Sequence, residues 1–85
     1  MEVVVKLSKS SYRRLRGHVP ADSAAYEPME KATAFEHSME GVLFAGYTIA
    51  CDGGQARALL EIACRHCPEA VAEIEKALAA AARRR

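Results

Sequence analysis

The sequence predicts an α+β protein: a small three-stranded antiparallel sheet with a C-terminal helix pair packed on one face, in the order β-α-β-β-α-α. Two observations lead to this prediction. Residues 42–51 form a nearly continuous apolar run rich in aromatic and β-branched types, which is typical of a buried strand. After Asp52, apolar residues recur at the spacing of one helix face. A length of 85 residues is that of a single domain, residues 1–85.

Two segments have the composition of strands. Residues 2–7 contain three consecutive valines, and their side chains alternate between two faces. Residues 42–51 are apolar on both faces, so we expect this strand to be central or to meet a second subunit. One face carries Leu43, Ala45, Tyr47, Ile49 and Cys51, and the other carries Val42, Phe44, Gly46, Thr48 and Ala50. Gly46 indicates a bulge or a close approach of another chain segment.

The segment that follows the first strand predicts a short helix over residues 8–17. Ser8 or Ser10 can cap its start by accepting from a free backbone N–H. Gly17 is expected to end it in the left-handed conformation. Residues 18–29 contain two prolines and predict a loop with one helical turn inside it.

Residues 30–41 allow two interpretations. The abundance of Glu, Lys, Ala and Met favours a helix. A strand from Lys31 to Ser38 would instead pair with the next strand through a Ser-Met-Glu-Gly turn, with Gly41 at positive φ. The hairpin is the favoured interpretation, because three strands are the minimum for an independently stable sheet.

Two helices are expected after the second apolar strand. Asp52 can cap the first, and Gln55 would complete a capping box. Pro68 is suited to the first position of the second helix. The apolar stripe on one side of the first helix is Ala56, Leu59, Leu60, Ala63 and Cys67, and that of the second is Val71, Ile74, Leu78 and Ala81.

Charge is unevenly distributed although the net charge is only +1. Residues 1–20 carry five cations and one acid, and residues 21–82 carry ten acids and four cations. Basic clusters can bind the phosphates of nucleic acids. The candidate residues for nucleic-acid binding are Lys9, Arg13, Arg14, Arg16, Arg83, Arg84 and Arg85.

The cysteines suggest a third class of function. Cys64 and Cys67 form a Cys-x-x-Cys pair, which in other settings is a redox pair or half of a zinc site. Here the pair comes at the end of a helix, where the dipole opposes a thiolate, and no second close pair supplies four ligands. Cys51, Cys64 and Cys67 are therefore interpreted as packing residues and only weak metal candidates, and no cofactor is expected.

Catalytic and membrane functions are not expected. The sequence has no phosphate-binding loop, nucleophile elbow or dinucleotide fingerprint. It has no apolar run long enough to span a bilayer and no signal-peptide pattern, so a reducing cytoplasm is the expected location.

Together these observations predict a small intracellular protein–protein interaction or regulatory module without catalytic activity. Alanine supplies much of the apolar content, and such a thin core favours a homodimer or another protein partner. The candidate contact residues are Phe44, Tyr47, Val71, Ile74 and Leu78. The alternatives are a nucleic-acid-binding regulator and a metal or thiol protein.

Overall fold

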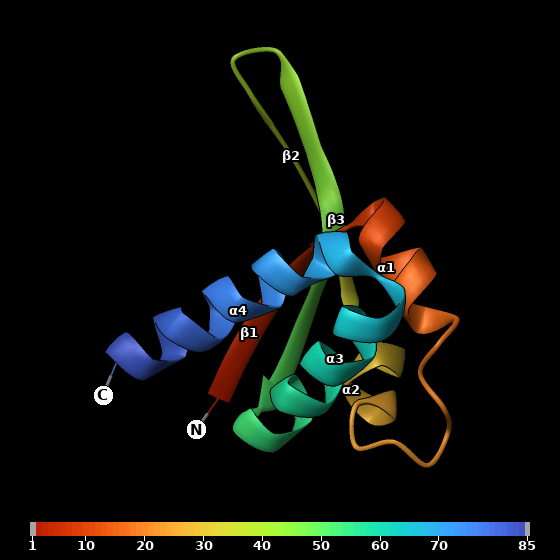
Figure 1. The fold of residues 1–85 in the computed structure, drawn as a ribbon. Helices are drawn as coiled ribbons and strands as arrows, with labels where there is room; N and C mark the ends of the chain where they lie inside the picture. The colour runs from red at the N-terminus through yellow and green to blue at the C-terminus, as the bar shows by residue number, and fades with distance from the viewer. Residues whose placement is uncertain (1, 85) are drawn as a thin grey trace.

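A three-stranded antiparallel sheet with helices against one face forms the body of the protein (Figure 1). The computed structural model describes residues 2–84, and the predicted α+β class is confirmed. In chain order the elements are β1 (Glu2–Ser8), α1 (Lys9–Arg16), α2 (Tyr26–Glu30), β2 (Thr33–Met39), β3 (Val42–Asp52), α3 (Gly53–His66) and α4 (Pro68–Arg83). The five-residue helix α2 is an addition to the predicted order: the helical turn was expected at Ala21–Tyr26 and lies instead at the end of the loop.

β3 is the central strand, as its two apolar faces predict. It pairs with β1 from Asp52 to Gly46 and with β2 from Thr48 to Val42, in the sheet order β1-β3-β2. Residues 33–39 are a strand, so the hairpin interpretation is confirmed. The turn is shorter than expected: Glu40 and Gly41 have φ values of 53° and 80°, the backbone of a two-residue hairpin turn.

The core lies on one face of the sheet, between the strands and the helices. Side chains of β1 and β3 meet those of α3 and α4 there. The fully buried members with large side chains include Val3, Val5, Leu7, Ile49, Leu59 and Ile74. Because strand side chains alternate, the other face of the sheet carries the intervening residues.

Helix α4 packs through a row of small side chains. The buried residues of this helix are Ala70, Ile74, Ala77 and Ala81. The expected stripe differs in part from this buried row, since Val71 and Leu78 are half-buried at the margin of the core, as is Leu60 of α3. Methyl side chains allow the helix to lie close to β1, and the larger residues are displaced to its flanks.

The start of α1 follows the sequence prediction and its end does not. The Ser8 hydroxyl accepts from the Ser11 backbone N–H at 3.3 Å, which caps the helix. Gly17 has φ −65°, so the expected left-handed conformation was wrong. The chain instead continues in a tighter turn, with the His18 N–H donating to the Leu15 carbonyl at 3.0 Å.

The predicted capping box at the start of α3 is confirmed. The Asp52 carboxylate accepts from the Gln55 backbone N–H at 2.7 Å, and the Gln55 side chain accepts from the Asp52 N–H at 3.0 Å. This arrangement turns the chain directly from β3 into α3. Within residues 2–84, no helix combines the length and apolar character required to cross a membrane.

Gly46 marks the point where the sheet narrows from three strands to two. The β1–β3 pairing ends with Ser8 opposite Gly46, and β3 continues beyond it paired with β2 alone. A Cβ atom on Gly46 would collide with the Leu7 carbonyl oxygen and would lie 3.1 Å from a ring carbon of Phe35. The close approach expected from the sequence is confirmed, and only glycine fits here.

We expect Gly46→Ala to lower the free energy of unfolding by at least ~1–3 kcal/mol, because a backbone carbonyl cannot move aside cheaply. Urea unfolding followed by circular dichroism measures the change. Gly17→Ala is the matched control, since its Cβ would lie 3.6 Å from the Arg14 carbonyl oxygen at an ordinary φ. Equal stability of the two variants would contradict the assigned role of Gly46.

Candidate functional site

The distal half of the β2–β3 hairpin extends beyond the helices (Figure 1). We call residues 36–45 the hairpin arm. From Thr33 to Ala45 no residue is buried. The arm has four large apolar side chains with high exposed fractions: Met39 at 60%, Val42 at 53%, Leu43 at 60% and Phe44 at 46%. Met39, Val42 and Phe44 share one face of the arm, and Leu43 lies on the opposite face. Exposed apolar residues grouped on one face mark an interaction site more often than scattered ones do.

The sheet face opposite the core continues onto the arm. We call it the outer face. On each strand every second residue belongs to this face, and residues paired across neighbouring strands share it. They are Glu2, Val4, Lys6 and Ser8 of β1, Thr33, Phe35, His37 and Met39 of β2, and Val42, Phe44, Gly46, Thr48, Ala50 and Asp52 of β3. The outer face therefore has apolar side chains on the arm, aromatic rings at its middle, and charged and hydroxyl side chains toward the body.

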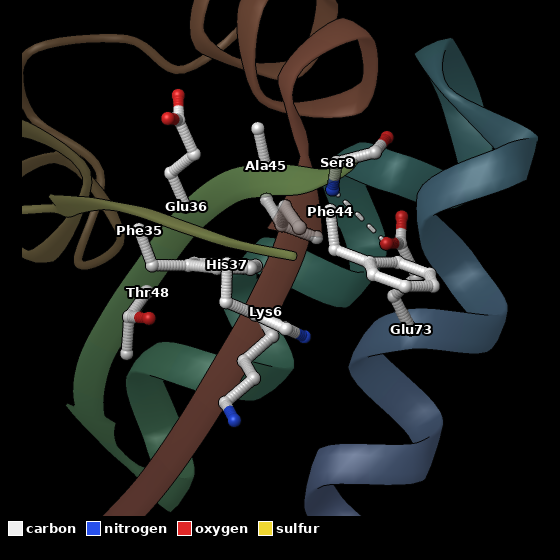
Figure 2. Close-up of a pocket in the computed structure, with 10 residues that line it drawn as sticks. Lys6, Ser8, Phe35, Glu36, His37, Phe44, Ala45, Thr48 and Glu73 are labelled. Carbon is white, nitrogen blue, oxygen red and sulfur yellow. Dashed lines mark hydrogen bonds between the residues drawn. The ribbon is translucent and has the colours of Figure 1, made fainter. Parts of the chain in front are cut away.

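A shallow groove of about 580 Å³ opens beside the end of β1 (Figure 2). Residues of the outer face line it together with Leu7, Glu36 and Ala45 of the opposite face. The rings of Phe35, His37 and Phe44 form a row along it. The His37 ring centroid lies 6.2 Å from that of Phe35 and 5.2 Å from that of Phe44, with nearly parallel planes. Lys6 of β1 and Glu73 of α4 line the same groove.

A smaller groove of about 270 Å³ lies between β1 and α4. Val4 and Lys6 line one side, and Glu73, Lys76 and the alanines of α4 line the other. The two grooves share Lys6 and Glu73, so they form one continuous surface along β1.

The two edges of the sheet differ in how they are covered. Helix α4 lies along β1, and the Glu73 carboxylate accepts from the Ser8 backbone N–H at 3.1 Å. In the described residues, β2 pairs only with β3. The outer edge of β2 thus keeps unpaired backbone groups, which can bind another strand.

The predicted contact residues fall in different environments. Phe44 lies on the hairpin arm, whereas Tyr47 is half-buried with its ring centroid 3.9 Å from that of Tyr12. Val71 and Leu78 are half-buried on α4. Ile74 is 0% exposed, so it is a core residue and is not available on the surface for a contact.

Sequence reasoning missed three exposed residues of the arm: Met39, Val42 and Leu43. One signal was available, since β3 was predicted to be longer than the first strand. With eleven residues in β3 and seven in β1, part of β3 must extend past the body. The exposed residues lie on that extension.

Two cations of α1 are already paired with acids. The Arg14 Nη1 atom lies 2.6 Å from Glu69 Oε1, and the Arg16 Nη2 atom lies 3.4 Å from Glu30 Oε1. Both pairs are exposed, and such pairs are weak enough to exchange with phosphate.

The two basic clusters do not lie together. α1 contacts the first turn of α4 through the Arg14–Glu69 pair, whereas Arg83 and Arg84 follow at the other end of that helix. The 16 residues of α4 separate them by about 24 Å. Arg85 lies outside the described residues. Lys9 and Arg13 are exposed, and both belong to the cluster on α1.

The cysteines have separate environments. Cys51 and Cys67 are buried, whereas Cys64 is exposed, so its interpretation as a packing residue was wrong. Burial, followed by the charge of Asp52, raises the pKa of the Cys51 thiol to about 11. Burial also raises the pKa of the Cys67 thiol, whose Sγ lies 3.9 Å from the Ser11 carbonyl oxygen. Neither buried thiol is activated as a nucleophile.

Residues 2–84 contain no group of three His, Cys, Asp or Glu side chains placed to hold a metal ion. His18 and His66 stack with ring centroids 4.0 Å apart, but no third donor joins them. The weak metal candidates are thus not brought together in the described part of the chain.

The chain matches no protein-family model, and searches of curated proteins and of solved structures find no significant match. A functional assignment therefore depends on the geometry of the site.

We expect one thiol per chain to react rapidly with an aromatic disulfide reagent at pH 8, because only Cys64 is exposed. Cys51 and Cys67 have raised pKa values, so even above pH 9 their thiolates form less readily than in the unfolded chain. Absorbance during labelling measures the number of thiols that react per chain. In urea all three cysteines should react. Rapid reaction of two or more thiols in the folded protein would contradict the assigned burial.

Proposed function

We propose that this protein is a protein–protein interaction module that associates with copies of itself, with the hairpin arm and the outer face as the contact surface. The observation that supports this proposal most directly is the exposure of Met39, Val42, Leu43 and Phe44 on one projecting hairpin. Exposed apolar area of this extent is unfavourable in water, and its removal from water is the main driving force of association.

The composition of the outer face favours a protein partner over a polyanion. Its grooves contain Lys6 and Lys76, but also Glu73. A protein surface that binds nucleic acid needs an excess of cationic side chains to replace the counterions condensed on the phosphates. The outer face has aromatic and aliphatic side chains at its centre and few charges at its margin, which is the usual arrangement of a protein contact.

The core supports the homo-oligomeric part of the proposal. In α4 three of the four buried residues are alanines, which contribute little buried area. A domain of this length has little margin of stability by itself. Covering the outer face with a second copy would add apolar burial that the helices do not provide.

We expect Phe44→Asp to weaken self-association at least ~10-fold, because it places a charge at the centre of the apolar patch. Sedimentation equilibrium at micromolar to high micromolar concentration measures the dissociation constant. Phe44 is 46% exposed and lies outside the core, so the fold should be retained, as circular dichroism can check.

Tyr26→Asp is the matched control, since Tyr26 is also a large exposed side chain, 38% exposed, but lies on α2. The dissociation constant of this variant should equal that of the unmodified protein. A protein that remains monomeric at high micromolar concentration would refute the proposed function, as would equal effects of the two substitutions.

A further inference from the structure

The hairpin arm has a second open edge, on β3, which indicates how two copies meet, an inference that rests on the proposed function. We propose that two copies join edge to edge through β3, antiparallel about a two-fold axis at Leu43, so that their arms form one four-stranded sheet. In this register Leu43 lies opposite Leu43 of the second copy, and Val42 lies opposite Phe44 of the second copy.

The hairpin turn determines which backbone groups face this edge. Around a two-residue turn, Met39 and Val42 exchange both backbone hydrogen bonds, and such pairs alternate along an antiparallel ladder. The N–H and C=O groups of Val42 and of every second residue after it therefore point to β2, and those of Leu43 and Ala45 point to the other side. Because β1 pairs with β3 only as far as Gly46, no strand in the described part of the chain lies beside Leu43 and Ala45.

The end of β1 agrees with this alternation and leaves room for a strand. Ser8 lies opposite Gly46, whose backbone points to β2, and the Ser8 N–H donates to Glu73 instead of to β3. The larger groove opens at this point, with Phe44 and Ala45 among the residues that line it (Figure 2). A strand that continues the position of β1 along the arm would extend into this groove.

The extent of the open edge selects the register. When two antiparallel strands pair about a two-fold axis perpendicular to the sheet, one residue lies opposite its own copy. An axis at Phe44 or Ala45 would place a residue of the second copy opposite Gly46, where β1 already lies. An axis at Val42 would place Phe44 opposite a residue of the turn. The axis at Leu43 keeps the strand pairing within the open edge.

Each large side chain at this edge then meets an apolar one. On the outer face Val42 lies opposite Phe44 of the second copy, a β-branched and aromatic pair of the kind that stabilises sheets. On the other face the two Leu43 side chains, each 60% exposed in the single chain, lie opposite each other. Across the two arms the outer face carries a row of neighbours, which are Met39, Val42, and Phe44 and His37 of the second copy. The exposed apolar side chains of both arms thus form a single cluster, with less area in water.

The size of the contact indicates reversible association. Residues 42–45 of each copy and the side chains beside them bury less than about 1,200 Å² in total, the range of weak and transient interfaces. We therefore expect dimers to form at micromolar to high micromolar concentration. Because the strand is complementary to itself in this register, a second copy fits the edge without any further chain.

Pairing through the open edge of β2 is the competing arrangement. Two β2 strands that pair over their full length place Glu36 opposite its own copy, and like charges directly opposite each other are destabilising. Leu43 and Phe44 belong to the other edge of the arm, so pairing through β2 would leave both exposed. The β3 edge has no charged residue from 42 to 45, and its pairing avoids both costs.

Disulfide cross-linking tests this register. Leu43→Cys places two thiols at a pair whose Cα atoms lie ~5.5 Å apart, within the span of a disulfide. The exposed Cys64 is first replaced by serine, which leaves only the two buried native cysteines. In a glutathione redox buffer the Leu43→Cys chain should form a cross-linked dimer at least ~10-fold faster than a Glu36→Cys chain in the same background. Non-reducing gel electrophoresis measures both rates.

Glu36→Cys is the matched control, since Glu36 is also exposed and lies on the same face of the arm but belongs to the β2 edge. Circular dichroism checks that both variants keep the fold.

Hydrogen exchange of the unmodified protein, followed by nuclear magnetic resonance, is a second measurement that needs no substitution. The Leu43 N–H points to the open edge of β3, so its exchange should slow as the dimeric fraction rises from low to high micromolar concentration. The Glu36 N–H points to the open edge of β2, and its exchange rate should not change with concentration.

The outcomes separate this inference from the proposed function. Equal cross-linking rates of Leu43→Cys and Glu36→Cys would overturn pairing through β3, as would a Leu43 N–H whose exchange is independent of concentration. If the protein still forms a dimer that Phe44→Asp disrupts, these results overturn the edge arrangement alone. A monomer at high micromolar concentration would overturn both the arrangement and the proposed function.

Discussion

The close approach of the Leu7 carbonyl oxygen to Gly46 is the constraint on which the rest of the structure depends. At this point β1 leaves the sheet to enter α1, while β3 continues with β2 as its only neighbour. A side chain at position 46 would separate the two strands. The absence of one allows the body to end abruptly and the hairpin arm to project beyond it.

Much of the fold follows from local sequence signals. The apolar faces of residues 42–51 predict a central strand, and Asp52 with Gln55 predicts the capped turn into α3; both are found in the structure. These signals succeed because hydrophobic alternation and capping depend on neighbouring residues. The burial of Ala70 and Ala77 in α4 was not predicted, since the sequence alone favours the larger Val71 and Leu78 for the apolar stripe.

The candidate surface was predictable only in part. Phe44 was expected to belong to a contact face, but Met39 and Val42 become a patch only through the pairing of β2 with β3. Pairing register and strand overhang are tertiary properties. The opposite error occurred at Ile74, whose helical spacing is the same for a core residue and for a contact residue.

The central claim is that the outer face, including the arm, is covered by a second copy. Hydroxyl-radical footprinting at low and at high micromolar concentration tests it most directly, with oxidation of Met39 and Phe44 as the readout and Tyr26 as the internal reference. The account predicts that Met39 and Phe44 become protected as concentration rises while Tyr26 does not. Oxidation of Met39 and Phe44 that is independent of concentration would contradict it.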